Sequence, residues 1–312
     1  MLLKITSFFI ILFTLIITSS AQATCLRNAS GAIIVDADNS TRMVSSTNGS
    51  ADQCSEIPDA YKIKFYKMGV CTEDPIDPDL SSCSFMLDNS AGVDHVIRMP
   101  NVGTLPTGDF DIPPGTYTHL VGLMSNRFGI NHTETFSESL RGLTSSGTTC
   151  WSIADKVTAY TNETINNGLD SHDTTATNSP PDTNVLECGS ASDADPGFSY
   201  EVINVFSNAC SSWDGYWNTG EGRTMSNGTA EARLLKTDNT AATACTNATR
   251  MLWVVQFTNP LKVTKTSQFS LEFKLTDSVS VDLGTDGSTG YAVKMGADPV
   301  TSILTVTEPS TD

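Results

Sequence analysis

The chain has 312 residues and a formal net charge of −17, from 18 Lys and Arg against 35 Asp and Glu. Such an acidic chain repels nucleic acids and anionic membranes, which argues against both as partners. Only 17% of the residues are charged, and Thr and Val are plentiful, which favours strands over helices. The length suits one large domain or two smaller ones.

Residues 1–23 are predicted to be a signal peptide. Lys4 provides the positive start, residues 8–17 are almost entirely apolar, and Ala21-Gln22-Ala23 fits a signal peptidase site. The apolar run is too short for a membrane anchor, which needs roughly 20 apolar residues. We therefore expect cleavage after Ala23 and a mature chain without a membrane span. It would be secreted or held at the cell surface, with the periplasm as the alternative.

All eight cysteines follow the predicted signal peptide. An even number in an exported chain favours disulfides, and no C-x-x-C pair suggests a zinc or redox site. Eight cysteines allow roughly a hundred pairings, which sequence alone cannot distinguish. The simplest prediction joins neighbours, each bridge contributing roughly 3–4 kcal/mol by restricting the unfolded chain. The predicted pairs are Cys25–Cys54, Cys71–Cys83, Cys150–Cys188 and Cys210–Cys245.

The clearest strand in the first half of the chain is 61–68. Its apolar residues Tyr61, Ile63 and Phe65 alternate with Lys62, Lys64 and Tyr66, so one face is buried and the other is wet. A turn-rich loop between Cys71 and Cys83 follows, in which prolines prevent a central strand. Further strands are predicted at 32–35, 85–87, 95–99 and 115–124.

The last of these strands begins in a distinctive way. Asp111-Ile-Pro-Pro-Gly115 fixes a turn, and Tyr117 follows in the strand. This Pro-Gly-x-Tyr pattern resembles small sandwich modules of the transthyretin or carboxypeptidase-regulatory kind. The resemblance covers about ten residues and assigns no family. It implies a β-sandwich setting for this strand.

A polar segment at 161–197, rich in Asn, Thr, Ser, Asp and Pro, separates two strand-forming regions, 24–160 and 198–312. We interpret it as a loop tied down through Cys188, with an interdomain linker as the alternative. Before it, 151–160 fits either a strand or a short helix. The second region contains strands at 200–206, 251–257, 270–276, 278–283, 291–295 and 302–306, with a tight turn at 284–287.

This pattern predicts an all-β fold. It consists of one or two disulfide-stapled antiparallel β-sandwich units, Ig-like or jelly-roll-like, with long polar loops. The 198–312 region is either a second unit or part of the same sandwich.

No catalytic signature emerges from the chain. Gly142–Gly147 lacks the spacing of a nucleophile elbow, and the phosphate-binding, dinucleotide-binding and metalloprotease motifs are absent. His132-Thr-Glu134 has the His-x-Glu spacing of zinc deaminases, but the required Pro-Cys-x-x-Cys is missing. We therefore predict no catalytic residues and no enzyme, with a secreted hydrolase as the remaining alternative.

Two groups of residues could bind a ligand. Asp74, Asp77 and Asp79 lie in the loop between Cys71 and Cys83, and such oxygens suit calcium, the one cofactor that the sequence suggests. Their alternative role is in turns, where Asp is common. The second group, Trp213, Asp214, Tyr216 and Trp217, could stack on and hydrogen-bond a sugar. Its alternative is a hairpin turning at Asp214-Gly215.

Export, strands, disulfides and the lack of catalytic motifs favour a secreted structural or adhesive surface protein, as a subunit of an extracellular filament or coat. The strand-like end of the chain, 302–308, could add to the sheet edge of a neighbour and so mediate self-association. Its alternative is an ordinary last strand. A carbohydrate- or calcium-binding β-sandwich module is the alternative function, with a glycan or protein receptor as partner.

Overall fold

The computed structural model describes residues 24–35, 44–46, 49–51, 53–98, 112–159, 186–204, 206, 214–218, 228–276, 278–286, 290–298 and 300–307. They form strands β1 to β19 and two short 3-10 helices, η2 (Ala191–Asp193) and η5 (Cys245–Asn247). Among these residues, no helix has the length and apolarity to cross a membrane. The predicted signal peptide, 1–23, lies outside them.

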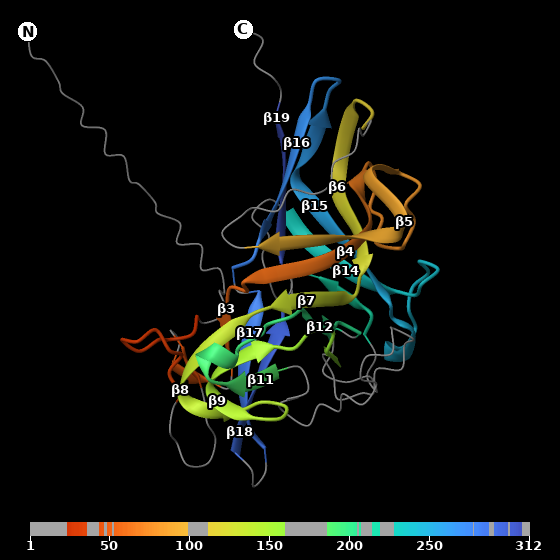
Figure 1. Ribbon diagram of the computed structural model, residues 1–312. Helices are drawn as coiled ribbons and strands as arrows, with labels where there is room; N and C mark the ends of the chain where they lie inside the picture. The colour runs from red at the N-terminus through yellow and green to blue at the C-terminus, as the bar shows by residue number, and fades with distance from the viewer. Residues whose placement is uncertain are drawn as a thin grey trace, which may run out of the picture.

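The largest sheet has nine strands and curls into a half-barrel (Figure 1). Eight strands follow one another by hydrogen bonding, and β5 (Cys83–Arg98) pairs with β4 from the side. The order is β10 (Val157–Ala159), β12 (Ser199–Val202), β7 (Arg127–Asn131), β4 (Ala60–Cys71), β6 (Gly115–Ser125), β15 (Arg250–Val263), β14 (Gly228–Leu235) and β13 (Tyr216–Asn218). Strands from both sides of the polar segment 161–197 therefore share this sheet.

The sheet divides at Asn126, between β6 and β7. Both strands pair with β4, but beyond them β6 pairs with β15 whereas β7 pairs with β12. The buried Asn126 side chain donates hydrogen bonds of 3.0 Å to the carbonyls of Ile203 and Ala248, one on each side of the division. The Asn126 side chain thus takes the place of backbone hydrogen bonds between strands at the point where β6 and β7 separate.

Strand β4 confirms the alternation read from the sequence. Tyr61, Ile63 and Phe65 are fully buried on the inner face, and Lys62 and Lys64 lie on the outer face. The predicted apolar strand at 251–257 is also confirmed, because β15 lies between β6 and β14 inside the sheet.

A six-stranded sheet packs against the inner face of the lower part of the half-barrel. Its order is β11 (Leu186–Gly189), β9 (Ser146–Ser152), β8 (Thr133–Arg141), β18 (Gly290–Ala297), β17 (Val279–Asp286) and β3 (Gln53–Glu56). The main core lies between the two sheets, where Tyr61 and Phe128 share one apolar cluster with Phe136, Leu140 and Val281.

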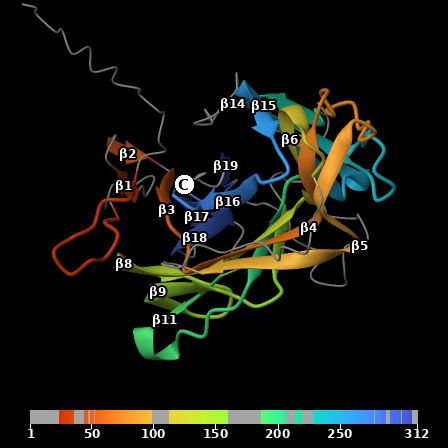
Figure 2. The same ribbon diagram turned by 90° about the horizontal axis from the view of Figure 1, so that it is seen from above.

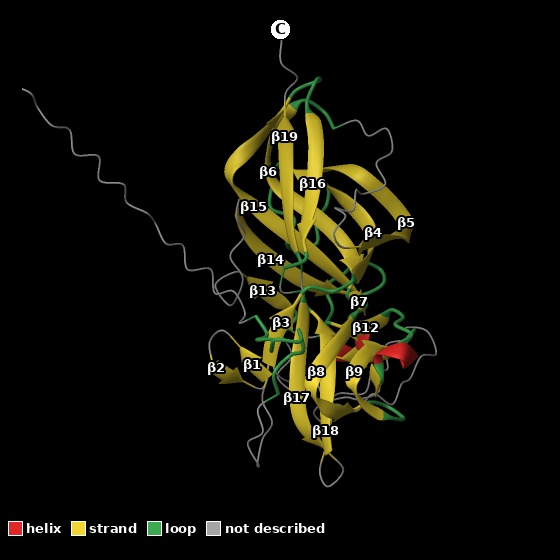
Figure 3. Cartoon of the chain, turned by 60° about the vertical axis from the view of Figure 1, so that its left-hand side comes forward, coloured by secondary structure: helices red, strands yellow, loops and turns green. Residues whose placement is uncertain are grey.

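Two smaller sheets complete the fold. One pairs β1 (Val44–Ser46) with β2 (Gly49–Ala51), and the other pairs β16 (Gln268–Lys274) with β19 (Thr301–Thr307). Seen from above, the half-barrel curves around β16 and β19 (Figure 2). Leu304 of β19 packs there against Tyr117 and Val255. Figure 3 shows β16 and β19 in the upper half and β17 and β18 in the lower half.

Three of the four predicted disulfides are present: Cys25–Cys54, Cys71–Cys83 and Cys150–Cys188. They tie the N-terminal segment to β3, the end of β4 to the start of β5, and β9 to β11. Cys245 is also disulfide-bonded, while Cys210, its predicted partner, lies outside the described residues. Three such bonds indicate an oxidising, extracellular environment.

The expected all-β fold with mostly antiparallel sheets and disulfides is confirmed, whereas the Ig-like or jelly-roll-like assignment stays a prediction. Several boundaries differ. The strands expected at 85–87 and 95–99 are one strand, β5, whose residues 89–92 bulge around Gly92 at a φ of +78°. Gly284 to Asp286 belong to β17, so the expected turn begins later. The polar segment 161–197 contains β11 and η2.

Candidate functional site

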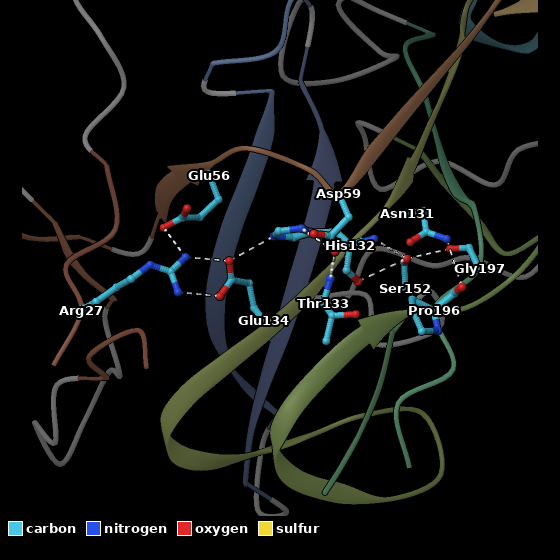
Figure 4. A network of polar contacts seen from close by, with 10 residues as sticks. All are labelled: Arg27, Glu56, Asp59, Asn131, His132, Thr133, Glu134, Ser152, Pro196 and Gly197. Carbon is cyan, nitrogen blue, oxygen red and sulfur yellow. Dashed lines mark hydrogen bonds and ion pairs between the residues drawn. The ribbon is translucent and has the colours of Figure 1, made fainter. Parts of the chain in front are cut away.

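Five charged residues form a network on the inner side of the six-stranded sheet (Figure 4). They come from four separate parts of the chain: the N-terminal segment 24–35, the end of β3, the turn before β4, and the start of β8. The members are Arg27, Glu56, Asp59, His132 and Glu134. Because these segments are distant in sequence, the network joins the N-terminal segment to the two sheets.

Glu134 is the centre of the network. The Arg27 guanidinium donates two hydrogen bonds to it, 2.9 Å from Nη1 to Oε2 and 2.7 Å from Nη2 to Oε1. Arg27 Nη2 also lies 3.0 Å from Oε1 of Glu56. His132 Nε2 is 3.2 Å from Glu134 Oε1, and its Nδ1 is 3.6 Å from Asp59 Oδ2. The side chains of His132 and Glu134 are only 3% and 7% exposed.

The electrostatics follow from this geometry. Burial alone would lower the pKa of His132, but Asp59 and Glu134 raise it to about 9. Burial would raise the pKa of Glu134, but His132 and Arg27 hold it below its usual value. Burial and repulsion from Glu134 raise the pKa of Glu56. At neutral pH the network therefore contains an imidazolium and a guanidinium around an ionised Glu134.

Neighbouring hydrogen bonds hold the His132 backbone in place. The Ser152 hydroxyl accepts a hydrogen bond of 3.0 Å from the His132 amide and donates one of 2.7 Å to the Gly197 carbonyl. The Thr133 amide donates to Asp59 at 3.0 Å. Both ring nitrogens of His132 face carboxylates, Nε2 towards Glu134 and Nδ1 towards Asp59. The network acts as a clamp between segments.

The predicted calcium ligands lie in turns. Asp74 and Asp79 each accept a 3.0 Å hydrogen bond from the amide two residues ahead, of Ile76 and Ser81. Asp77 forms an ion pair of 2.8 Å with Arg233. In the part of the chain that the structure describes, no group of three or more His, Cys, Asp or Glu is arranged to hold a metal ion. A calcium site here stays a prediction.

The predicted aromatic site is divided between two faces. Trp213 lies outside the described residues, and Asp214 accepts a 3.0 Å hydrogen bond from the Tyr216 amide. Tyr216 and Trp217 follow each other in β13 and so point to opposite faces. On the outer face, Tyr216 donates a 2.8 Å hydrogen bond to Glu231 of β14.

Trp217 lies on the inner face and stacks on a residue that sequence analysis did not select, Trp253. Their ring centroids are 5.7 Å apart with an interplanar angle of 20°, and Phe206 lies 6.5 Å from Trp217. Ala232 of β14 lies between the two indoles in register and leaves room for them to meet. All three rings remain partly exposed. Trp253 could not be paired with Trp217 from sequence, because nothing in the strand pattern marks their contact.

Another group lies on the outer face of β5, β4, β7 and β12. It combines four cations with two aromatic rings, and we call it the cation–aromatic patch: Lys62, Lys64, Arg98, Arg127, Phe198 and Tyr200. Lys62 and Lys64 belong here because they alternate with the buried residues of β4.

Tyr200 is central to the cation–aromatic patch. The Arg127 guanidinium lies 4.1 Å from its ring centroid, and Lys62 Nζ donates a 3.1 Å hydrogen bond to its hydroxyl. Gly129 separates Lys62 from Tyr200 in register, and a Cβ there would lie 2.8 Å from the ring. The ring therefore rests on the glycine, which permits its contact with Lys62.

Phe198 extends the patch towards β5. It lies 5.7 Å from Lys62 Nζ and 6.0 Å from the Arg98 guanidinium. Asp94 pairs with Lys62 at 3.0 Å and approaches Lys64 at 3.8 Å. Burial would lower the pKa of Lys62, but Tyr200 and Asp94 raise it above its usual value, so the amine stays charged.

Comparison with known proteins gives no further assignment. No family model matches the chain, and no curated protein and no solved structure matches it significantly.

Proposed function

We propose that this is a secreted structural or adhesive surface protein that serves as a subunit of an extracellular filament or coat. The disulfides support a place outside the reducing cytosol. The core between the half-barrel and the six-stranded sheet supports a sandwich, either Ig-like or jelly-roll-like, as its scaffold.

Strand β19 carries this proposal. It pairs with β16 over seven residues, from Thr301 opposite Lys274 to Thr307 opposite Gln268. Within the described part of the chain, β19 has no second strand neighbour. Leu304 is buried, whereas Thr305 and Thr307 are exposed. A strand with a bare edge is a ready site for pairing with another chain, and association through it would link subunits.

Self-association of the mature chain, residues 24–312, tests the proposal. Light scattering after size exclusion should show species larger than a monomer that increase with concentration, and negative-stain microscopy should show regular assemblies. Thr305→Lys places a charge on the β19 edge and should return the chain to a monomer. The matched control is Thr135→Lys, an exposed threonine of β8 between β9 and the 24–35 segment. A strict monomer at high concentration would refute the proposal.

A second candidate function is carbohydrate binding, favoured by the partly exposed Trp217–Trp253 stack. Indole faces stack on sugar rings, and both rings are partly exposed beside the core clusters against which they pack. A glycan array should give a signal that Trp217→Ala removes. Phe85→Ala is the control, because it removes a partly exposed ring of β5 that lies outside this stack. Equal loss in both variants, or no signal at all, would exclude this function.

The calcium form of this alternative depends on Asp74, Asp77 and Asp79. A bound calcium ion would stabilise the folded chain by mass action. Melting curves with calcium and with a chelator therefore test it, and coincident curves would remove calcium from consideration.

A further inference from the structure

We propose that the cation–aromatic patch is a binding site for an anionic polysaccharide, one that carries carboxylate or sulfate groups. The proposal names a ligand class for the adhesive role proposed above, and it rests on that adhesive role. It does not depend on association through β19.

Charge complementarity is the first argument. The chain as a whole carries a net charge of −17. Yet Lys62, Lys64 and Arg98 gather on one sheet face beside Arg127, and a single carboxylate, Asp94, pairs with Lys62 and approaches Lys64. At physiological ionic strength charges are screened beyond about 8 Å, so a bound polymer responds to the local cations more than to the distant acidic surface.

Preorganisation is the second argument. Flexible surface lysines lose side-chain entropy when they bind a ligand. Here Lys62 is already held by Tyr200 and Asp94, and Arg127 lies on the Tyr200 ring. Arg98 lies against Phe198 at 6.0 Å. Lys62 and Arg127 are therefore held in place before a ligand arrives, while Lys64 and Arg98 remain exposed beside them.

Shape is the third argument, and it favours an extended polymer over a folded acidic partner. The patch runs across β5, β4, β7 and β12, which are neighbours in the sheet. Three strand spacings amount to about 14 Å, the reach of a short oligosaccharide. A folded protein partner normally needs roughly 800 Å² on each side, far more than one such row. The aromatic rings between the cations can also contact the apolar faces of sugars.

The test measures binding of the mature chain to heparin as a sulfated probe, alginate as a carboxylated probe, and dextran as a neutral probe. The patch variant is Lys64→Gln/Arg98→Gln, which changes two exposed cations. The matched control, Lys262→Gln/Lys274→Gln, changes two exposed lysines of β15 and β16 and gives the same net charge. Thermal melting of all three chains confirms that they fold equally well.

Binding to heparin or alginate, and not to dextran, is expected. The patch variant should bind about thirtyfold more weakly, since each Lys or Arg facing a polyanionic surface contributes roughly fivefold to the affinity. The control should keep the wild-type affinity. Binding to heparin alone assigns a sulfated ligand, and binding to alginate alone assigns a carboxylated one.

Three outcomes would overturn the inference: no binding to either charged probe, equal weakening in both variants, or equal binding to dextran. If the patch variant loses self-association and the wild type binds no probe, the patch is a contact between copies of the chain. Thr305→Lys separates the two proposals. A chain that is monomeric with or without this change but binds the charged probe refutes the filament and keeps the polysaccharide.

Discussion

Two charged groups, the network around Glu134 and the cation–aromatic patch on the outer face of the half-barrel, show how burial changes the use of charge. In the buried network, Arg27 and His132 face three carboxylates, and Glu134 contacts both cations. In the cation–aromatic patch, four cations face Asp94 and two rings. A buried charge must be paired, because removing it from water costs several kcal/mol. In the patch, Lys64 and Arg98 are exposed, so these two cations remain accessible to a ligand.

The largest effect should come from removing the central carboxylate of the buried network. Glu134→Gln leaves the buried His132 imidazolium without its nearest carboxylate and removes the main partner of the exposed Arg27, so we expect a loss of about 3–5 kcal/mol in the free energy of unfolding. Urea denaturation measures this loss. Glu272→Gln, an exposed glutamate of β16, makes the same chemical change and should alter stability by less than about 0.5 kcal/mol. Similar small changes in both variants would show that the network stabilises nothing.

The pH dependence of stability sharpens the comparison. The pKa of His132 is about 9 in the folded chain against 6.5 for the free side chain. Its contribution is therefore complete below pH 6.5 and is lost as the pH rises through 9, amounting to about 3 kcal/mol. Urea midpoints between pH 6 and pH 9.5 should fall accordingly. His132→Asn should be less stable at pH 6 and lose this dependence, whereas a parallel decline in the variant would assign it to other groups.

The buried network also shows where sequence reasoning ends. The alternation of 61–68 predicted β4 because one face is uniformly apolar. In β8, Glu134 occupies a buried position, so the strand lacks an apolar period and was missed. Its main partner, Arg27, is 107 residues away and has no local signature. His132-Thr-Glu134 was noticed as a motif, but its actual partners, Arg27 and Asp59, are set by tertiary packing alone.

The cation–aromatic patch was missed for a similar reason. Lys62 and Lys64 were correctly expected on the wet face of the strand, yet Tyr200 lies 138 residues from Lys62. Gly129, which lets them meet, belongs to β7, a short strand that sequence analysis did not identify. The disulfides were easier to predict from sequence than these contacts. Neighbouring cysteines join segments that are close in sequence, and three of the predicted pairs are confirmed.

Gly129→Ala disturbs the contact between Tyr200 and Lys62 in the cation–aromatic patch. Its Cβ would lie 2.8 Å from Tyr200 and 3.2 Å from Lys62, so the ring must move. Crowding costs about 1–3 kcal/mol, and the gain of about 0.5–1 kcal/mol from replacing a strand glycine offsets part of it. We expect a net loss of about 1 kcal/mol in urea denaturation. Gly115→Ala is the control, because the nearest atom lies at 3.6 Å, and it should be neutral. Equal stability of the two variants would mean that Tyr200 does not rest on Gly129.

The smallest effect on stability, and the clearest contrast with Glu134→Gln, is expected for Asp94→Asn. Asp94 is 42% exposed and pairs with Lys62 at 3.0 Å, and exposed pairs contribute only about 0–1 kcal/mol. The free energy of unfolding should change by less than about 0.5 kcal/mol. Removing this carboxylate also removes the competitor for Lys62 and Lys64, so affinity for a charged polysaccharide should rise about fivefold. Stability and affinity together distinguish the two groups. The buried carboxylate Glu134 stabilises the fold, whereas the exposed carboxylate Asp94 competes with a ligand for the cations of the patch. A large loss of stability in Asp94→Asn would place the patch with the buried network, as a structural device.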